Sequence, residues 1–567
     1  MTVRNPADLR PNGEMQTALA NALAQFADLP ALVLESGRSV SYGELAKEAG
    51  AIGAHLPDRK ALVVIEGGNN PATVAAYVGA LLKGHAVHLL EPDKPGALAS
   101  IRERFGLDAH IRCSSEGWHV QTSLHEPPKV HDAIAILFST SGTTGASKLV
   151  KITQRNILSN TQSIVRYLGI ENIDRAITVL KPHYSYGLSV LNSHLLSGAS
   201  LLLTDRSVQD PWFWSLASEW QITNFAGVPH TFETLARGGT SLQTLPSLRF
   251  VTQAGGKLHP ELVRKFAAAG ERSGWRFYVM YGQTEASPRM AYLPPEMALS
   301  DPDAIGVPVP GGRLEIVDEE GRSIEEPFRR GELVYYGPNV MAGYASSRED
   351  LADAAHVERL ATGDLAFRRP NGLFVLAGRK SRFVKPLGIR VSLDEVEQVL
   401  IGEGFAVAAV SAGEAVAIFH EGAPPLTHAR ASELLNLPKP LIHIHISHEL
   451  PRLPSGKVDY AALQSLALSP ARVSLCAHPL RFVAEVAREA VAIMVGSVDR
   501  SRSITSVFRE VMRLTSVDLA DTFVSLGGDS LTYVGLTIAL EELVGPLPAN
   551  WHLMTINELE ALRGARE

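Results

Sequence analysis

Residues 138–148 read Phe138-Ser139-Thr140-Ser141-Gly142-Thr143-Thr144-Gly145-Ala146-Ser147-Lys148. This run directly follows the apolar stretch 133–138, which has the length of a buried strand. Hydroxyls and glycines at this density offer many hydrogen-bond donors, and Lys148 adds a point charge, so the run predicts a phosphate-binding loop. It is not a Walker loop, which requires glycine at position 147 and serine or threonine at 149, where this chain has serine and leucine. A plain polar surface loop is the alternative, although such a loop would rarely follow a buried strand and end in lysine. The predicted phosphate ligands are Thr140, Ser141, Gly142, Thr143, Thr144, Gly145 and Lys148.

Short apolar runs alternate with helical spacing on both sides of this loop. The runs expected to be strands are 61–65, 133–138, 177–180, 201–203 and 277–280, and the stretches expected to be helices are 72–82 and 261–269. This alternation predicts the α/β class. After Gly312 the pattern changes to strand and turn, with strands expected at 314–317 and 332–336, which predicts a small, separate β-rich subdomain.

Size and composition limit the kinds of protein that this chain can be. With 567 residues, 45% hydrophobic, 20% charged and a mean hydropathy of +0.04, it is expected to be a globular protein of three to four domains. The only cysteines, Cys113 and Cys476, give neither a disulfide framework nor metal-ligand spacing, which favours a reducing compartment. We find no signal-peptide pattern and no apolar run of about 18 residues, so a cytoplasmic location without a membrane span is expected. Residues 501–567 carry five Lys or Arg against nine Asp or Glu, which argues against nucleic acid and for a basic partner surface.

Five further motifs follow the loop in order along the chain. They are Gln253-Ala254-Gly255-Gly256-Lys257, Tyr281-Gly282-Gln283-Thr284-Glu285, Thr362-Gly363-Asp364, Gly378-Arg379-Lys380-Ser381 and Pro451-Arg452-Leu453-Pro454-Ser455-Gly456-Lys457. Together with residues 138–148, these motifs resemble those of the adenylate-forming superfamily, which includes acyl-CoA synthetases, nonribosomal peptide adenylation domains and firefly luciferase. Each motif alone is a weak signal, but six in the family's order leave little room for coincidence.

The resemblance implies ATP as a substrate and Mg²⁺ as its partner. In the family, Thr144 and Glu285 would hold Mg²⁺, Thr284 would contact the phosphates, and the carboxylate of Asp364 would bind both ribose hydroxyls. The remaining residues that the resemblance assigns to ATP or AMP are Gly255, Gly256, Tyr281, Gly282 and Arg379.

The chemistry implied by the resemblance explains why cations are needed. Attack of a carboxylate on the α-phosphorus of ATP brings anions together and expels pyrophosphate, so the site must neutralise charge. The resemblance makes Lys457 the cation that bridges the substrate carboxylate and the α-phosphate, and with Thr144 and Glu285 it completes the predicted catalytic set. A solvated surface lysine is the alternative, but the frame Pro451 to Gly456 restricts its approach.

Two segments of the resemblance concern movement between half-reactions. Family members rotate a small C-terminal domain about a hinge that is usually aspartate or lysine, and this chain has Ser381 at that position with Lys380 beside it. Gly388 matches the glycine that lets pantetheine pass the backbone in a tunnel. Both half-reactions are therefore expected.

The acid pocket is predicted by counting back from the run Leu195 to Ala199. Amino-acid-activating relatives carry a Phe-Asp pair where this chain has Tyr184 and Ser185, and no carboxylate lies within 183–193. A buried ammonium without a partner is strongly disfavoured, so an α-amino acid is an unfavourable substrate and a fatty, aryl or hydroxy acid is expected. The predicted pocket residues are His183, Tyr184, Ser185, Tyr186 and Gln253.

A last motif, Leu526-Gly527-Gly528-Asp529-Ser530-Leu531, precedes an apolar stretch with helical spacing. It resembles the attachment site of 4′-phosphopantetheine in acyl and peptidyl carrier domains, with Ser530 as the anchor. An ordinary loop that caps a helix is the alternative. The carrier interpretation implies two protein partners, a phosphopantetheinyl transferase and a downstream enzyme that uses the thioester.

The predicted domains are an adenylation core (1–378), a mobile α+β C-terminal domain (379–463), a linker with helical pieces (464–500) and a helical-bundle carrier (501–567). The predicted function is activation of a carboxylic acid with ATP and its transfer to the chain's own pantetheine thiol. Three alternatives stay open: a free acyl-CoA ligase with a vestigial carrier, an amino-acid-activating didomain and a noncatalytic scaffold.

Overall fold

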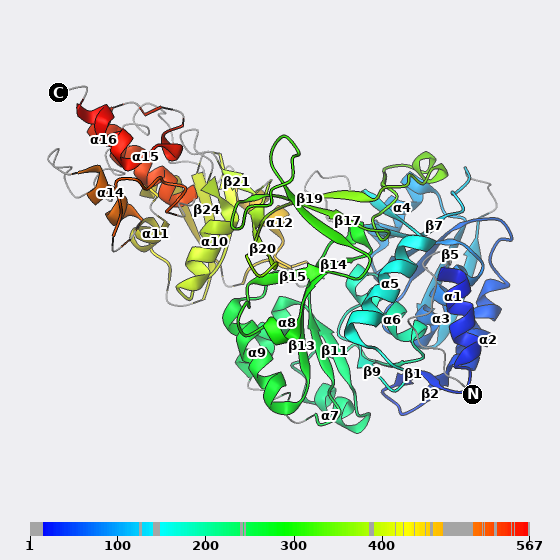
Figure 1. Ribbon diagram of the computed structural model, residues 1–567. Coiled ribbons are helices and arrows are strands. Elements are labelled where there is room, and N and C mark those ends of the chain that lie inside the picture. Colours follow the sequence, from blue (N-terminus) through cyan, green and yellow to red (C-terminus); the bar gives the residue numbers. More distant parts are fainter. Residues whose placement is uncertain are drawn as a thin grey trace. The chain divides into compact units, whose positions relative to one another are not determined.

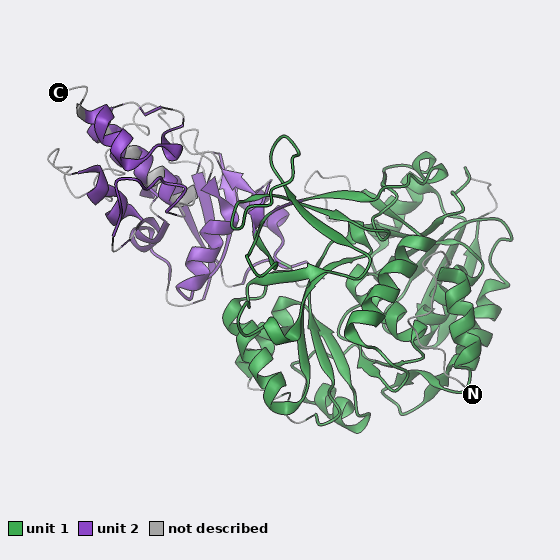
Figure 2. Cartoon of the chain, in the orientation of Figure 1, with its two compact units in different colours: residues 1–362, 366–376, 454–457 green, residues 363–365, 377–453, 458–567 purple. Residues whose placement is uncertain are grey.

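The computed structural model divides the chain into two compact units, coloured separately in Figure 2. Unit 1 comprises residues 1–362, 366–376 and 454–457, and unit 2 comprises 363–365, 377–453 and 458–567. The structure describes residues 15–468 and 503–564, apart from 124–127, 140–147, 239–241, 243–244, 381, 385–390, 414, 423–424, 436, 448, 454–456, 513, 515, 527–529, 546 and 549. In the described ranges, no helix has both the length and the apolar character needed to cross a bilayer.

A large sheet of 13 strands runs through the chain, ordered β16-β17-β19-β20-β15-β14-β13-β12-β11-β9-β10-β1-β2. From β13 to β1 the neighbouring strands are parallel, so their carboxyl ends meet at one edge of the sheet. Strands β14 and β15 continue it antiparallel. The bounds are β1 (Pro30–Leu34), β2 (Ser39–Ser41), β9 (Arg175–Ile177), β10 (Ser200–Leu203), β11 (Asn224–Gly227), β12 (Phe250–Gln253), β13 (Arg276–Gly282), β14 (Arg289–Leu293), β15 (Ala304–Pro308), β16 (Arg313–Val317), β17 (Gly331–Tyr336), β19 (Arg359–Arg368) and β20 (Phe374–Arg379).

A second sheet, ordered β18-β8-β7-β4-β3-β5-β6, carries the predicted phosphate loop. Its strands are β3 (Leu62–Glu66), β4 (Ala86–Leu90), β5 (Ala109–Ser114), β6 (Gly117–Thr122), β7 (Ile134–Ser139), β8 (Leu149–Thr153) and β18 (Tyr344–Ala345). β7 is parallel to β4 and antiparallel to β8, so the chain reverses direction between positions 139 and 149.

Helices form layers on these sheets (Figure 1). One apolar core unites the first group, α1 (Met15–Gln25), α2 (Tyr42–Gly53), α3 (Pro71–Leu82), α5 (Gln154–Leu168) and α6 (Ser185–Leu196), with strands of both sheets. A second core packs α7 (Pro211–Glu219), α8 (Pro229–Gly238) and α9 (Pro260–Ser273) on the other face of the large sheet. α4 (Pro95–Phe105) packs on the second sheet through Ile101 and Phe105. The layers confirm the predicted α/β class.

One prediction about strands needs correction. The strand expected at 177–180 lies at Arg175–Ile177, because residues 180–182 pack against helix α6 instead: a Cβ on Gly187 would lie only 2.1 Å from Lys181 O. The β-rich segment after Gly312 has its own apolar core, and its strands join the large sheet through β15.

The first part of unit 2 is a small α+β body. It contains the two-stranded sheet β21 (Phe383–Val384) and β22 (Val391–Ser392), and a three-stranded sheet of β23 (Ala406–Ala412), β24 (Ala415–Glu421) and β25 (Ile442–Ser447). The helices are α10 (Leu393–Gly402), α11 (His428–Leu435) and α12 (Tyr460–Ala467). The side chains of Val396, Leu400, Ile418 and Leu435 are fully buried in its core.

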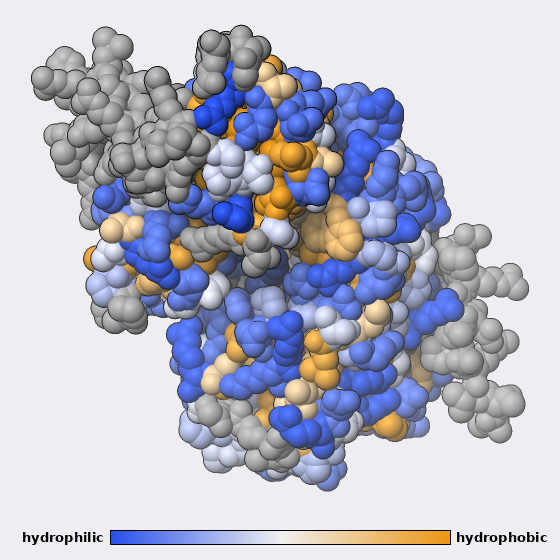
Figure 3. Space-filling view, turned by 60° about the vertical axis from the view of Figure 1, so that its left-hand side comes forward, coloured by the Kyte–Doolittle hydropathy of each residue, from blue (hydrophilic) through white to orange (hydrophobic). Residues whose placement is uncertain are grey.

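The last described part contains α14 (Ile504–Val511), α15 (Ser530–Val544) and α16 (Ile556–Gly564). They share an apolar core that includes Phe508, Leu536, Leu540, Trp551 and Leu559. The helix predicted to begin at Ser530 is therefore present, while most of the predicted linker lies outside the described residues. On the face of the molecule in Figure 3, hydrophilic residues predominate over smaller apolar patches.

Candidate active site

The predicted phosphate loop begins and ends on paired strands. Ser139, the last residue of β7, is the register partner of Leu149, the first residue of β8. Residues 140–147, including the predicted ligands Thr140 to Gly145, lie outside the described residues. Lys148 is described and exposed, and its Nζ lies 5.9 Å from the centroid of the Tyr344 ring on β18, which pairs with β8.

Glu285 lies in the turn Thr284–Ala286, which follows strand β13. Tyr344 donates a hydrogen bond of 2.9 Å from its hydroxyl to Glu285 Oε1. Burial, reinforced by the negative charge of Glu285, raises the pKa of Tyr344, so this hydroxyl stays protonated and can donate at neutral pH. Tyr344 therefore lies between two predicted ligands of the nucleotide, Glu285 and Lys148.

Two buried asparagines hold the backbone that follows this turn. Asn339 donates through Nδ2 to Ala286 O (2.6 Å) and to Arg289 O (2.9 Å). Asn160 donates to Arg289 O (2.9 Å) and accepts from Arg289 N (3.2 Å). Gly282 is required for close packing here, since a Cβ on it would lie 1.9 Å from Pro288 O. The turn is thus held from two sides before any ligand binds.

Gly255 lies just past the end of β12 with φ +90°, a conformation that favours glycine. A Cβ at this position would lie 2.8 Å from Tyr184 Oη and 3.9 Å from Lys457 Cε. The structure therefore brings together three residues that the sequence predicted separately. Gly256, the next residue, is exposed and accepts a hydrogen bond of 2.9 Å from Gln253 Nε2.

The predicted acid pocket begins at helix α6. Ser185 opens the helix, and its hydroxyl shares a hydrogen bond of 3.2 Å with Thr284 Oγ1. The hydroxyl of Tyr186 donates to Thr252 O over 3.0 Å. Burial lowers the pKa of His183, whose Nδ1 has no hydrogen-bond partner in the described part of the chain, so this ring is neutral at pH 7.

Gln253 contributes a second unsatisfied buried atom. Its side chain is fully buried, and Oε1 has no hydrogen-bond partner among the described residues. An unpaired buried acceptor is costly, so Oε1 is available to a donor that enters the site.

A buried cation, Arg289, lies next to these aromatic residues. It is only 3% exposed, and its Cζ lies 3.9 Å from the centroid of the Tyr186 ring. Burial raises the pKa of Tyr184, and the positive charge of Arg289 opposes that increase. Arg289 was not predicted from the sequence. The available signal was a charged residue at the start of the otherwise apolar strand Arg289–Leu293.

In unit 2, two predicted nucleotide residues form an ion pair. Arg379 Nε lies 3.2 Å from Asp364 Oδ1, and the Asp364 carboxylate is buried whereas Arg379 is exposed. Lys380 N donates to Gly363 O over 2.8 Å. The predicted hinge serine, Ser381, and the predicted tunnel glycine, Gly388, lie outside the described residues, as does the side chain of Ser530.

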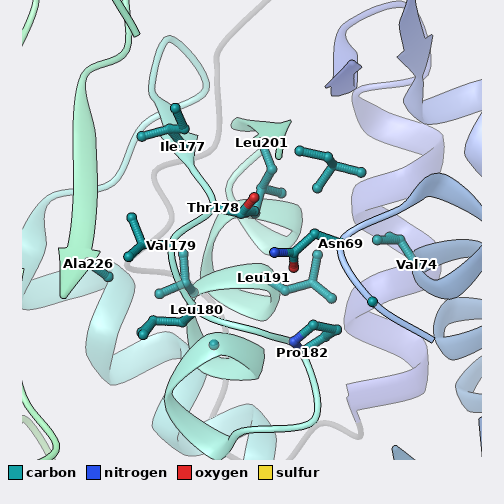
Figure 4. Close-up of a pocket in the computed structure, with 14 residues that line it drawn as sticks. Asn69, Val74, Ile177, Thr178, Val179, Leu180, Pro182, Leu191, Leu201 and Ala226 are labelled. Carbon is teal, nitrogen blue, oxygen red and sulfur yellow. The ribbon is translucent and has the colours of Figure 1, made fainter. Parts of the chain in front are cut away.

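A small cavity of about 30 Å³ lies beside helix α6 (Figure 4). Its lining is mostly apolar and includes Asn69, Thr178, Leu180, Pro182, Leu191 and Ala226.

Comparison with known proteins identifies a matching protein family and several similar proteins. Residues 102–345 match the family described as AMP-binding enzyme. Phenyloxazoline synthase MbtB from Mycobacterium sp. (strain MCS) is 27% identical over 576 residues, which cover 93% of this chain. The chain spans 47% of that relative, about half its length. Sulfoacetate–CoA ligase from Cupriavidus necator is 27% identical over 493 residues, covering 78% of this chain and 95% of the relative.

A solved structure has the same fold. O-succinylbenzoate coenzyme A synthetase (MenE) from Bacillus subtilis, in complex with ATP and magnesium ion, superposes with a TM-score of 0.65 at 22% identity. The match covers 78% of this chain and 98% of that structure. At this identity, the similarity establishes the fold of the covered part and nothing further.

Proposed function

Since this chain is a ligase of the AMP-binding enzyme family, we propose that it activates a carboxylic acid with ATP and transfers the acyl group to a pantetheine thiol. In the first step a carboxylate oxygen bonds to the α-phosphorus of ATP, and the bond from that phosphorus to the bridging oxygen breaks. Pyrophosphate leaves, and an acyl-adenylate is formed. In the second step the thiol sulfur bonds to the acyl carbon, the thiol proton is lost and AMP leaves.

The observation that carries this proposal is the cluster of Lys457, Tyr184 and Gly255 at the carboxyl end of β12. The ammonium group of Lys457 is attached to the Cε that lies 3.9 Å from the Cβ position of Gly255. A cation at the end of a parallel strand, where ligands of α/β sheets bind, can stabilise the negative charge shared by the carboxylate and the α-phosphate.

The described residues fit ATP and Mg²⁺. The unpaired Gln253 Oε1 can accept a hydrogen bond from the ligand. Glu285 would supply a carboxylate oxygen for Mg²⁺, which neutralises the leaving phosphates.

The pocket favours an acid without an α-ammonium group. Ser185 replaces the aspartate that would pair with an ammonium, and Arg289 adds a buried positive charge nearby. Tyr184 and Tyr186, with ring centroids 6.4 Å apart, fill much of the space beside it. Of the fatty, aryl and hydroxy acids predicted from the sequence, this aromatic surrounding favours an aryl or hydroxy acid.

Residues 501–567 are the proposed carrier, and three observations support it. Helices α14, α15 and α16 share one apolar core. Helix α15 begins at Ser530, where the positive end of the helix dipole favours a phosphodiester. The alignment with the MbtB relative leaves only about 40 residues of this chain uncovered, fewer than this region contains. Phosphopantetheine, added to Ser530 by a transferase, would supply the thiol, and a further enzyme would consume the thioester.

A free acyl-CoA ligase is the second candidate, because the C. necator relative is named as a CoA ligase and its match covers 78% of this chain. The two candidates differ in the acceptor. We would convert the protein to its pantetheinylated form, add ATP and a panel of acids, and measure its intact mass; in parallel reactions that also contain coenzyme A, we would measure acyl-CoA. An acyl adduct that is absent from Ser530→Ala supports the carrier. Formation of acyl-CoA at equal rates by both proteins, without an adduct, contradicts it.

A further inference from the structure

The guanidinium of Arg289 is a buried positive charge with no ion-pair partner in the described part of the chain. The residue is 3% exposed, and no Asp or Glu of the described chain forms a salt bridge with it. Its Nη2 also lacks a hydrogen-bond partner among the described residues. Buried arginines are normally paired, because an unpaired charge in a low-dielectric interior is costly.

The contacts that Arg289 does make do not explain its burial. The guanidinium stacks on the Tyr186 ring at 3.9 Å and also hydrogen-bonds the hydroxyl of Tyr186, but these contacts with a neutral side chain do not supply a counter-ion. The hydrogen bonds to Asn160 and Asn339 involve only the backbone of Arg289, so any side chain at this position would retain them.

The surroundings place this unpaired charge at the predicted acid pocket. Tyr186, beneath the guanidinium, lies one residue after Ser185, which is hydrogen-bonded to Thr284. The ring of Tyr184 lies 6.4 Å from that of Tyr186, and its hydroxyl lies against Gly255 and hence near Lys457. Two tyrosine rings of the predicted pocket thus link the surroundings of Arg289 with those of Lys457.

We propose that the acid activated by this protein carries a second anionic group, in its simplest form a second carboxylate, which pairs with Arg289. This inference rests on the proposed function and names the substrate class of the same site. One carboxylate would lie near Lys457 and react, and the other would accept two hydrogen bonds from the guanidinium. The charge that is unpaired in the free protein would be neutralised by the substrate.

The test compares matched pairs of acids: malonate with propionate, succinate with butyrate, glutarate with pentanoate, and phthalate with benzoate. Acid-dependent pyrophosphate release would be measured for the wild type, Arg289→Met and Arg289→Lys. We expect at least one diacid to exceed its monoacid in kcat/KM by about 30-fold or more in the wild type, and this ratio to fall at least tenfold in Arg289→Met, with partial retention in Arg289→Lys. The matched control is Arg276→Met, since Arg276 also lies over a tyrosine, Tyr278, but is exposed.

Two measurements separate this inference from misfolding and from failure of the proposed function. Without ATP, the favoured diacid should raise the melting temperature of the wild type but not of Arg289→Met. Arg289→Met itself should melt no lower than the wild type, because an unpaired buried charge has been removed.

Equal diacid-to-monoacid ratios in the wild type and Arg289→Met, or no thermal shift with any diacid, would overturn the inference. A raised KM for ATP with an unchanged acid preference would assign Arg289 to the nucleotide phosphates instead. If no acid of any pair supports pyrophosphate release while the diacid still raises the melting temperature of the wild type, the proposed function is contradicted and the inference about Arg289 is not.

Discussion

The hydroxyl of Tyr344 donates a 2.9 Å hydrogen bond to Glu285 Oε1, and the two residues lie 59 positions apart in the chain. The Tyr344 ring also lies 5.9 Å from Lys148 Nζ. The side chain of Tyr344 thus links the proposed Mg²⁺ ligand to the lysine at the end of the phosphate loop.

Tyr344→Phe should therefore raise the KM for Mg–ATP by roughly three- to tenfold, the value of about one typical hydrogen bond, with little effect on the KM for the acid. Steady-state pyrophosphate release at varied Mg–ATP checks this. Tyr336→Phe is a suitable control, because Tyr336 contacts Arg313 on the neighbouring strand β16. An equal effect of both substitutions would mean that Tyr344 does not position Glu285.

Gly255→Ala should lower kcat/KM for the acid by at least tenfold. The substitution forces alanine into φ +90° and sets its Cβ 2.8 Å from Tyr184 Oη. Gly311→Ala has nearly the same backbone strain, with φ +85°, but no atom within 4 Å of its Cβ position. Both variants should lose similar stability in thermal unfolding, and only Gly255→Ala should lose activity. Comparable activity losses would mean that strain alone is responsible.

Lys457→Ala should slow acid-dependent pyrophosphate exchange on the order of 10²-fold or more, because one cation that stabilises the transition state is removed. Transfer from a preformed acyl-adenylate to pantetheine should continue at a similar rate, since the domain-rotation interpretation moves this lysine away in the second step. Lys265→Ala, an exposed lysine of α9, is the control. Equal loss of both half-reactions would count against domain rotation.

Ser530→Ala should abolish covalent acyl loading and leave pyrophosphate release unchanged. For the pantetheinylated wild type, the loading rate should not depend on protein concentration, because a linker of about 40 residues reaches roughly 35 Å and tethering supplies an effective concentration near the millimolar range. Loading would be followed by intact mass over a hundredfold dilution. A rate that rises with concentration would mean that the thiol serves a neighbouring copy, and acylation of Ser530→Ala would remove the carrier assignment.

His85 should make the protein less stable in mild acid. Burial, together with the charges of Lys60 and Lys83, lowers the pKa of His85 to about 4, and neither ring nitrogen has a hydrogen-bond partner among the described residues. The unfolded chain binds a proton at this histidine below about pH 6.5, whereas the folded chain does so only near pH 4. Stability should therefore fall between these values, by at most about 1.4 kcal/mol per pH unit from this group.

Urea unfolding at pH 7 and pH 5 checks the sign. His85→Phe should lose less stability on acidification than the wild type, while His119→Phe, at an exposed position of β6, should behave like the wild type. If the pH dependence is the same in all three proteins, His85 does not bind a proton on unfolding in this range.

The layers and several site residues could be predicted from the sequence because they depend on local patterns. The strand at Leu62–Glu66 and the helix at Pro71–Leu82 follow from apolar spacing alone, and Ser530 begins a helix as predicted. The motif around Glu285 could be recognised because its residues are adjacent. Family similarity then supplied the roles that spacing cannot give, and those roles for individual residues stay predictions.

The residues that were missed act through contacts between distant parts of the chain. Nothing near Tyr344 indicates that its hydroxyl meets Glu285, and nothing near Arg289 indicates that it stacks on Tyr186 of helix α6. The strand expected at 177–180 ends early for the same kind of reason, since Gly187 lets Lys181 O approach the helix. Tertiary packing decides each outcome, and the local periodicity of the sequence carries no information about it.

The way in which Asn160 and Asn339 hold residues 286–289 has an evolutionary consequence. Their hydrogen bonds fix the backbone of Arg289 and do not involve its side chain. Replacement of that side chain would therefore change which acid is accepted without moving the neighbouring Glu285. Descendants of a duplicated gene could diverge in substrate by a single substitution at position 289, while the machinery for ATP is inherited intact.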